Sequence, residues 1–215
     1  MKVILTGATG MVGEGVLLEC LENPAVSKVL MVNRKASPVA HPKLEELIVP
    51  DFTKPEPYAS SLSGYDACFY CAGISSIGMN EEQYTHITYD TTLAFANKLA
   101  ALNPGMVFTF VSGSSTDSSE NGKVMWARVK GKTENALMKL PFKGAYNFRP
   151  GLMKPFKGQK NVKAILKPII LIFPLLFPKQ CLTLKQVGQA MINAVLKGYT
   201  KQILEIADIR ELAGN

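Results

Sequence analysis

Three glycines near the start of the chain have the spacing of a loop that binds phosphate. Gly7, Gly10 and Gly13 follow the short apolar run 3–5 and open an amphipathic stretch at residues 12–21. Gly7 would permit a sharp turn, Gly10 would let the backbone approach a diphosphate, and Gly13 would let the helix pack close to the strand. Free amides at the helix N-terminus would then face the phosphates. The pattern predicts a nucleotide site, and the alternative is a turn that serves packing only.

Apolar runs alternate with helical patterns along most of the chain. After the first strand, further strands are expected at residues 28–33, 44–49, 67–71, 106–112 and 145–148. Helices are expected at residues 12–21, 81–102 and 124–140. This alternation predicts right-handed crossovers and a doubly wound parallel sheet of Rossmann type, an α/β fold with helices on both faces. Ligands bind beyond the carboxyl ends of such strands, so loops 72–80 and 112–122 are expected at the site.

The alternation ends after residue 151. Residues 152–215 are expected to form a small substrate-side region, with a helix at 184–196 and a strand at 203–206, beside a dinucleotide-binding core. The apolar segment 164–177 is too short to span a bilayer and contains prolines. Three interpretations of this segment stay open: a core segment, a wall of a substrate pocket, or a surface that dips into a membrane.

Composition points to one domain in a reducing compartment. The chain has 215 residues, of which 47% are hydrophobic, enough for a single core over residues 1–215. Its four cysteines are too few for a disulfide scaffold, and no basic leader precedes the first strand, so a cytoplasmic protein is expected. Cys68 and Cys71 lie three apart on a predicted strand and would face opposite ways. They are therefore expected to be buried apolar residues and not a redox pair.

The positive charge is concentrated in the C-terminal third. Residues 141–215 carry 12 basic and 3 acidic side chains, a charge of +9, which leaves −2 for the rest of a total of +7. The cations that follow one another without an acid between them are Arg149, Lys154, Lys157, Lys160, Lys163 and Lys167. A solvated surface is expected, although such a face can attract anionic substrates or lipid. Because no groove-reading motif accompanies the charge, no nucleic acid partner is expected. A small-molecule substrate is expected, and a homo-oligomer stays open.

Residues after the second and third strands indicate which dinucleotide would bind. Asn33 is followed by Arg34 and Lys35, so no carboxylate stands at this point. A carboxylate here would hydrogen-bond the ribose and repel a 2′-phosphate. Arg34 can pair with a 2′-phosphate, so NADP is expected, with NAD as the alternative. A solvated basic loop without any discrimination is the other interpretation. Asp51 and Phe52 follow the third strand, where a carboxylate can accept from an adenine amino group.

With these motifs, and with the small residues after the fourth strand, the chain resembles the short-chain dehydrogenase/reductase superfamily. The resemblance is greatest to its extended and atypical branches, the epimerase-like and Tat-interacting oxidoreductase-like proteins, and it covers residues 6–13 through 149–151. It implies cofactor contacts from Thr6, Gly7, Thr9, Gly10, Met11, Val12, Gly13, Asn33, Arg34, Asp51, Phe52, Cys71, Ala72, Gly73, Lys130, Pro150, Gly151 and Leu152.

The resemblance also implies an active site from which one residue is missing. The superfamily uses a serine after the fifth strand, and a tyrosine four residues before a lysine on the next helix. Ser114 and Lys130 match, but Trp126 stands at the tyrosine position. Indole has no proton that titrates in the useful range, so it cannot move a proton to or from a substrate. Two hypotheses follow: an NADP-dependent oxidoreductase, or a dinucleotide-binding sensor or scaffold that has lost catalysis.

Other candidate side chains have less support from their spacing. Tyr84 and Tyr89 lie on the long predicted helix and are expected to pack. His41 and His86 have no carboxylate or cysteine at ligand spacing, so no metal site is expected. Lys130 could also be a solvated helix lysine, and the serines after residue 111 could only shape a loop.

Overall fold

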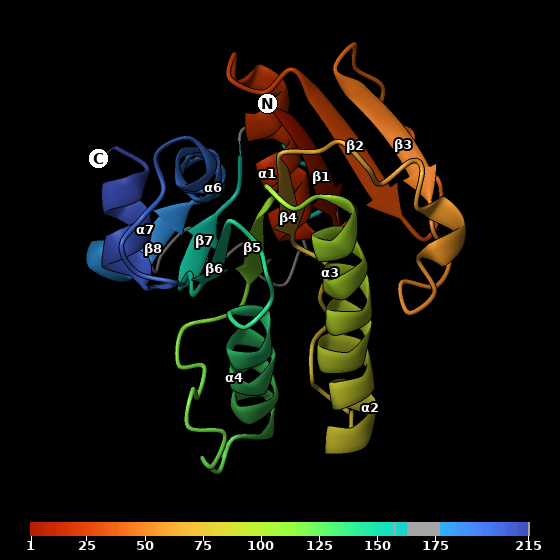
Figure 1. Cartoon of the computed structure of the whole chain (residues 1–215). Coiled ribbons are helices and arrows are strands. Elements are labelled where there is room, and N and C mark those ends of the chain that lie inside the picture. The colour runs from red at the N-terminus through yellow and green to blue at the C-terminus, as the bar shows by residue number, and fades with distance from the viewer. Residues whose placement is uncertain (157, 163–176, 215) are drawn as a thin grey trace.

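A seven-stranded parallel sheet forms the centre of the molecule (Figure 1). The computed structural model describes residues 1–156, 158–162 and 177–214. The strands are, in spatial order, β3 (Leu44–Ile48), β2 (Lys28–Asn33), β1 (Lys2–Thr6), β4 (Ala67–Tyr70), β5 (Val107–Val111), β6 (Gly144–Phe148) and β9 (Ile203–Leu204). All six neighbouring pairs run parallel. The predicted Rossmann-type α/β fold is confirmed.

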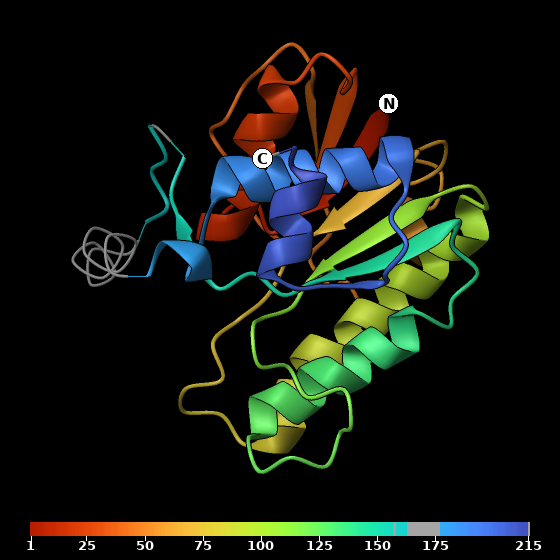
Figure 2. The same ribbon diagram turned by 90° about the vertical axis from the view of Figure 1, so that its left-hand side faces the viewer.

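Helices cover both faces of this sheet, as Figures 1 and 2 show. One face carries α1 (Met11–Glu22), α6 (Leu184–Lys197) and α7 (Ile206–Leu212). The other carries a long helical segment, made of α2 (Glu81–Thr85), the π-helical turn η2 (His86–Asp90) and α3 (Thr91–Leu102), and next to it α4 (Met125–Leu137). Each face is filled by its own apolar layer, because the central strands are buried on both sides. This arrangement leaves the loops at the carboxyl ends of the strands free to form a site.

The structure corrects several expected boundaries. The strand expected at 203–206 is shorter, because Ile206 already begins α7. Two strands that were not expected, β7 (Leu152–Lys154) and β8 (Cys181–Thr183), pair in a small parallel sheet. Short 3-10 turns lie at Glu56–Tyr58 and Pro178–Gln180. The apolar segment expected at 164–177 lies outside the described residues except for Phe177, which is exposed.

Helices α1 and α6 pack closely because two glycines lie between them. A Cβ atom on Gly15 would come 2.7 Å from the Leu184 side chain, and one on Gly188 would come 2.7 Å from Glu19. Glu19 is only 3% exposed, and its Oε2 atom has no hydrogen-bond partner within the described residues. Burial raises the pKa of Glu19, although a hydrogen bond from Asn23 opposes this shift. Ionised Glu19 therefore costs the fold stability.

Replacing Glu19 by glutamine is expected to stabilise the protein at neutral pH by about 1 kcal/mol, since a neutral amide removes the cost of a buried carboxylate. Because the folded-state pKa lies above the unfolded one, wild-type stability falls as the pH rises above the ordinary value of 4.5. The difference between variant and wild type should therefore shrink toward acid. Urea unfolding at several pH values measures this. Glu82→Gln, at an exposed site on α2, is the control, and an equal gain there would contradict the explanation.

Candidate functional site

The loop between β1 and α1 is held against the backbone of neighbouring segments. Gly7 has φ +74°, and a Cβ there would lie 2.6 Å from the amide nitrogen of Ala72. A Cβ on Gly13 would lie 2.1 Å from the carbonyl oxygen of Gly7. Neither contact leaves room for a side chain, which confirms the turn predicted at Gly7 and the close packing predicted at Gly13. Thr6 is fully buried, and its Oγ1 accepts a hydrogen bond from the Ala72 amide at 3.2 Å. Thr6 therefore supports the loop from beneath.

Gly10 differs from the other two glycines because it has open space beside it. A Cβ there would meet only the Gly7 carbonyl oxygen, at an ordinary 3.4 Å. Gly10 is the N-cap of α1 and caps the helix with no side chain, and the Glu14 amide donates to its carbonyl at 2.9 Å. The amides of the first turn, at Met11, Val12 and Gly13, come before this first helical bond. They have no acceptor within the helix and form its positive end. The loop thus presents bare backbone to the adjoining space.

A cavity of about 390 Å³ lies beside this loop, at the carboxyl ends of β1, β2 and β4. Ten expected cofactor residues line it together: Gly7, Thr9, Gly10, Asn33, Arg34, Asp51, Phe52, Cys71, Ala72 and Gly73. The cavity also has lining residues that the sequence did not indicate, namely Val32, Pro50, Thr53, Tyr70, Ile74, His86, Ile87 and Thr91. Its wall does not include the expected residues Thr6, Met11, Val12, Gly13, Lys130, Pro150, Gly151 and Leu152. The cavity therefore unites the loops that follow β1 to β4.

Two of the unexpected lining residues, His86 and Ile87, come from the π-helical turn, and a third, Thr91, directly follows it at the start of α3. In such a turn residues five apart lie above one another, which places His86 and Thr91 on the same side. The Thr91 hydroxyl donates to the His86 carbonyl at 2.9 Å, and Ile87 completes this wall. Apolar periodicity could not reveal the turn, because the residue that the turn buries is Thr88, which is polar. From the sequence, His86 is considered only as a possible metal ligand, and the structure places this residue in the cavity wall.

The far end of the cavity carries both signs of charge. Arg34 is exposed. Burial raises the pKa of the Tyr70 hydroxyl, and the charge of Arg34 opposes this shift. Asp51 accepts hydrogen bonds from the Thr53 hydroxyl at 2.6 Å and amide at 2.9 Å, and the hydroxyl is the main cause that lowers the pKa of Asp51. The Asn33 amide donates to Glu46 at 2.9 Å, so this side chain holds the loop after β2. An ionised acceptor and an exposed guanidinium thus line one cavity.

A second group of expected residues meets at the carboxyl end of β5. The Lys130 ammonium donates to the Ser112 carbonyl at 3.0 Å. Burial lowers the pKa of Lys130 to about 8, while the charge of Glu134 opposes this shift. A Cβ on Gly113 would lie 3.7 Å from the Trp126 ring. Ser114 is exposed. The cluster is thus centred on a lysine whose pKa is lowered by burial.

The chain after β6 approaches the same place. The Ser114 amide donates to the Pro150 carbonyl at 3.3 Å, which joins the loop after β5 to that after β6. Gly151 lies against the 3-10 turn Pro178–Gln180, because a Cβ there would come 2.6 Å from the Gln180 carbonyl oxygen. Leu152 begins β7 and pairs with Cys181. The structure therefore brings Ser114, Lys130 and Pro150 to one edge of the sheet, outside the cavity wall.

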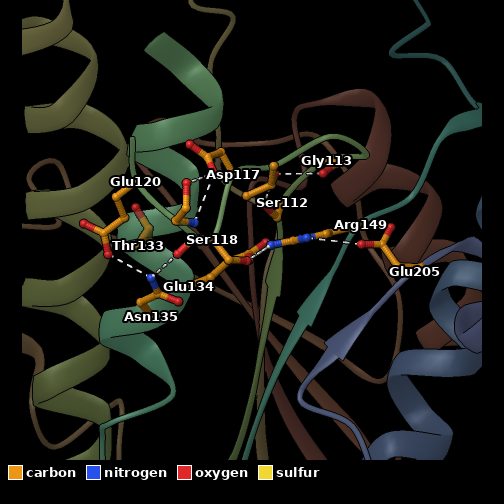
Figure 3. A network of polar contacts seen from close by, with 12 residues as sticks. Ser112, Gly113, Asp117, Ser118, Glu120, Thr133, Glu134, Asn135, Arg149 and Glu205 are labelled. Carbon is orange, nitrogen blue, oxygen red and sulfur yellow. Dashed lines mark hydrogen bonds and ion pairs between the residues drawn. The ribbon is translucent and has the colours of Figure 1, made fainter. Parts of the chain in front are cut away.

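Arg149 corrects an expectation made from charge alone. Its exposed fraction is 8%, and its guanidinium contacts the carboxylates of Glu134 and Glu205 (Figure 3). It therefore does not belong to a solvated basic face. The sequence could not show this, because Glu134 lies 15 residues away and Glu205 lies 56.

The cysteines and metal-ligand residues can be assessed over the described residues. Cys68 is fully buried and Cys71 half-buried, and burial raises the pKa of Cys71 to about 12. Both thiols are thus held neutral, which fits the expectation that they are not a redox pair. Within the described part of the chain, no three His, Cys, Asp or Glu side chains gather as a metal site. None of the helices there has the length and apolar character needed to cross a bilayer.

The fold, with a glycine loop and a cavity at the carboxyl ends of its parallel strands, is that of a Rossmann-type protein. Residues 3–136 match the NAD dependent epimerase/dehydratase family, and the chain belongs to it. The superfamily predicted from the sequence is thereby confirmed, and a nicotinamide dinucleotide is the cofactor class of this chain.

Known proteins resemble the chain over most of its length. The mitochondrial protein fmp52 of Emericella nidulans is 29% identical over 94% of this chain and 90% of its own. Protein HTATIP2 of Rattus norvegicus is 28% identical over 71% of this chain and 62% of its own. A dTDP-glucose 4,6-dehydratase, DesIV of Streptomyces venezuelae, crystallised with NAD, superposes with a TM-score of 0.70 at 18% identity, over 100% of this chain and 79% of its own. That likeness is one of fold.

Proposed function

We propose that this protein is an NADP(H)-binding oxidoreductase that acts on a small carbonyl or alcohol substrate. The observation that carries the proposal is the open face of Gly10, beside a cavity that ends at Arg34. A diphosphate fits a loop that has bare amides and no Cβ in the way. The arginine supplies the cation that a 2′-phosphate needs, which favours NADP over NAD. Its location in the cytoplasm, expected from the sequence, is part of the proposal, although fmp52 is named mitochondrial.

Residues of the cavity wall and of the segments next to it each have a part in holding the dinucleotide. The first-turn amides of α1 would bind the diphosphate, Arg34 the 2′-phosphate, and Asp51 the adenine amino group. Ala72 and Gly73 are small enough to let a ribose pass. Lys130 belongs to α4, and its ammonium donates to the Ser112 carbonyl at the carboxyl end of β5. From there it would donate to the hydroxyls of the second ribose. The nicotinamide, when bound, supplies or takes up hydride.

The proton that accompanies hydride transfer has no tyrosine to carry it. Trp126 stands in that position next to Gly113 and offers only an indole N–H. This observation favours a second candidate function, a dinucleotide-binding sensor that performs no turnover. The two functions predict different results for one substitution.

Changing Trp126 to tyrosine is expected to raise NADPH oxidation roughly tenfold with a panel of aldehydes and ketones, because a phenol one turn from Lys130 restores a general acid. NADPH absorbance follows the reaction, and Trp126→Phe is the control that adds no acid. If the wild type turns over and Lys130→Met does not, the result supports the enzyme hypothesis. Turnover by the tyrosine variant alone supports the sensor. Absence of turnover in every variant that binds NADPH would refute the carbonyl chemistry.

A further inference from the structure

Arg149 joins three elements around the end of β6. Its Nε donates to Glu134 Oε1 at 3.0 Å, and its Nη2 donates to the other oxygen of the same carboxylate. Nη2 also donates to the Ser118 hydroxyl at 2.6 Å, and Nη1 to Glu205 at 3.2 Å. Glu134 belongs to α4, Ser118 to the loop after β5, and Glu205 is the N-cap of α7 (Figure 3). One buried guanidinium thus holds α4, that loop and the start of α7 together.

The pairing with Arg149 matters for Lys130, which lies one helical turn before Glu134. Residues four apart on a helix are neighbours, and a free carboxylate there would attract the ammonium. Glu134 has no exposed surface, and Arg149 takes both of its oxygens. Lys130 points instead to the Ser112 carbonyl. The arginine thereby keeps a buried carboxylate from capturing a neighbouring lysine.

Arg149 also fixes the loop that leads away from Ser112. Besides the Ser118 bond, the Asp117 amide donates to the Ala127 carbonyl at 3.1 Å. A Cβ on Gly131 would come 1.8 Å from the Asp117 carbonyl oxygen, so α4 and the loop are in backbone contact. The Asp117 carboxylate is occupied by Ser119 and by the Gly122 amide. The position of the carbonyl that Lys130 bonds therefore depends on this loop.

We infer that Arg149 is a positioning residue for Lys130: it occupies Glu134 and anchors the loop, so that the ammonium of Lys130 is presented to a ligand at the carboxyl end of β5. The inference rests on the proposed function only in naming that ligand as the ribose of a dinucleotide. The charged groups of this network include Glu134 on α4, Asp117 on the loop, Arg149 after β6 and Glu205 before α7 (Figure 3), and Glu134 is the one whose charge acts on the pKa of Lys130. Burial is the main cause that lowers the pKa of Lys130, and Glu134 is the charged group that opposes it, whereas Asp117 and Glu205 are held by other donors.

Titration of Lys130 tests this inference without any cofactor. Competitive acetylation over a range of pH, read by mass spectrometry of the peptide that contains Lys130, gives its midpoint. In Arg149→Met the unpaired Glu134 should raise that midpoint by about one pH unit, and in Glu134→Gln the midpoint should fall. The double variant Arg149→Met with Glu134→Gln should return toward the wild-type value. A purely structural role would change stability without moving the midpoints in opposite directions.

The outcomes separate this inference from the proposed function. Equal midpoints in the wild type and Glu134→Gln would overturn the inference, and that variant tests it even where Arg149→Met fails to fold. Calorimetry with NADP⁺ should show roughly tenfold weaker binding to Arg149→Met than to wild type. Shifted midpoints in a wild-type protein that binds no dinucleotide would reject the proposed function while the inference stands.

Discussion

A Gly13→Ala variant is expected to lose about 3 kcal/mol of folding stability and to bind no dinucleotide. The added Cβ would lie 2.1 Å from the Gly7 oxygen and 2.4 Å from the Gly7 carbonyl carbon. Both obstacles are backbone atoms, and Gly7 is itself in backbone contact with the loop after β4. The substitution must therefore push α1 away from the sheet or deform the glycine loop. Urea unfolding followed by circular dichroism measures the loss.

Gly105→Ala provides the matched control for this prediction. A Cβ at Gly105 would meet no atom within 4 Å, and Gly105 does not have a positive φ. Its free energy of unfolding should stay within about 0.5 kcal/mol of the wild-type value. If Gly13→Ala were as stable as this control, the close approach of helix and loop would be wrong.

Arg34→Asp is expected to weaken NADP⁺ binding roughly 100-fold, equivalent to about 2.7 kcal/mol, and to leave NAD⁺ bound as well or better. The change removes the cation that lines the cavity and places a carboxylate where it repels a 2′-phosphate and can bond a ribose. Fluorescence titration with the reduced dinucleotides gives both affinities.

Lys35→Asp makes the same change of charge at the next residue, which does not line the cavity wall. It should weaken NADP⁺ binding much less, because long-range attraction between exposed charges is screened by salt. Equal losses in the two variants would mean that only the net charge of the loop matters. The assignment of Arg34 to the 2′-phosphate would then fail.

The part of the site that follows β1 to β4 could be predicted from the sequence because its signals are local. A strand that ends at Thr6, a turn at Gly7 and a helix start at Met11 are neighbours in the chain. Parallel strands then carry the residues after each strand to one edge. Arg34 and Asp51 line one cavity for this reason.

The rest of the site depends on contacts between distant segments. His86 and Ile87 reach the cavity through a π turn, whose one buried residue, Thr88, is polar and gives no apolar signal. Arg149 has the sequence context of a basic surface, yet Glu134 and Glu205 enclose it once α4 and α7 pack. Such pairing follows from tertiary packing and has no signature in spacing. Very short strands such as Leu152–Lys154 are likewise defined by their neighbours.

Binding of NADP⁺ to the wild type and to Gly10→Ala, measured by calorimetry, tests the central claim most directly. A Cβ on Gly10 meets nothing closer than 3.4 Å, so the variant should keep its stability, yet bind at least roughly tenfold more weakly because the methyl group faces the diphosphate. Equal binding by the two proteins, or no heat from the wild type with NADP⁺, NADPH, NAD⁺ or NADH, would contradict the assignment of this loop to a dinucleotide.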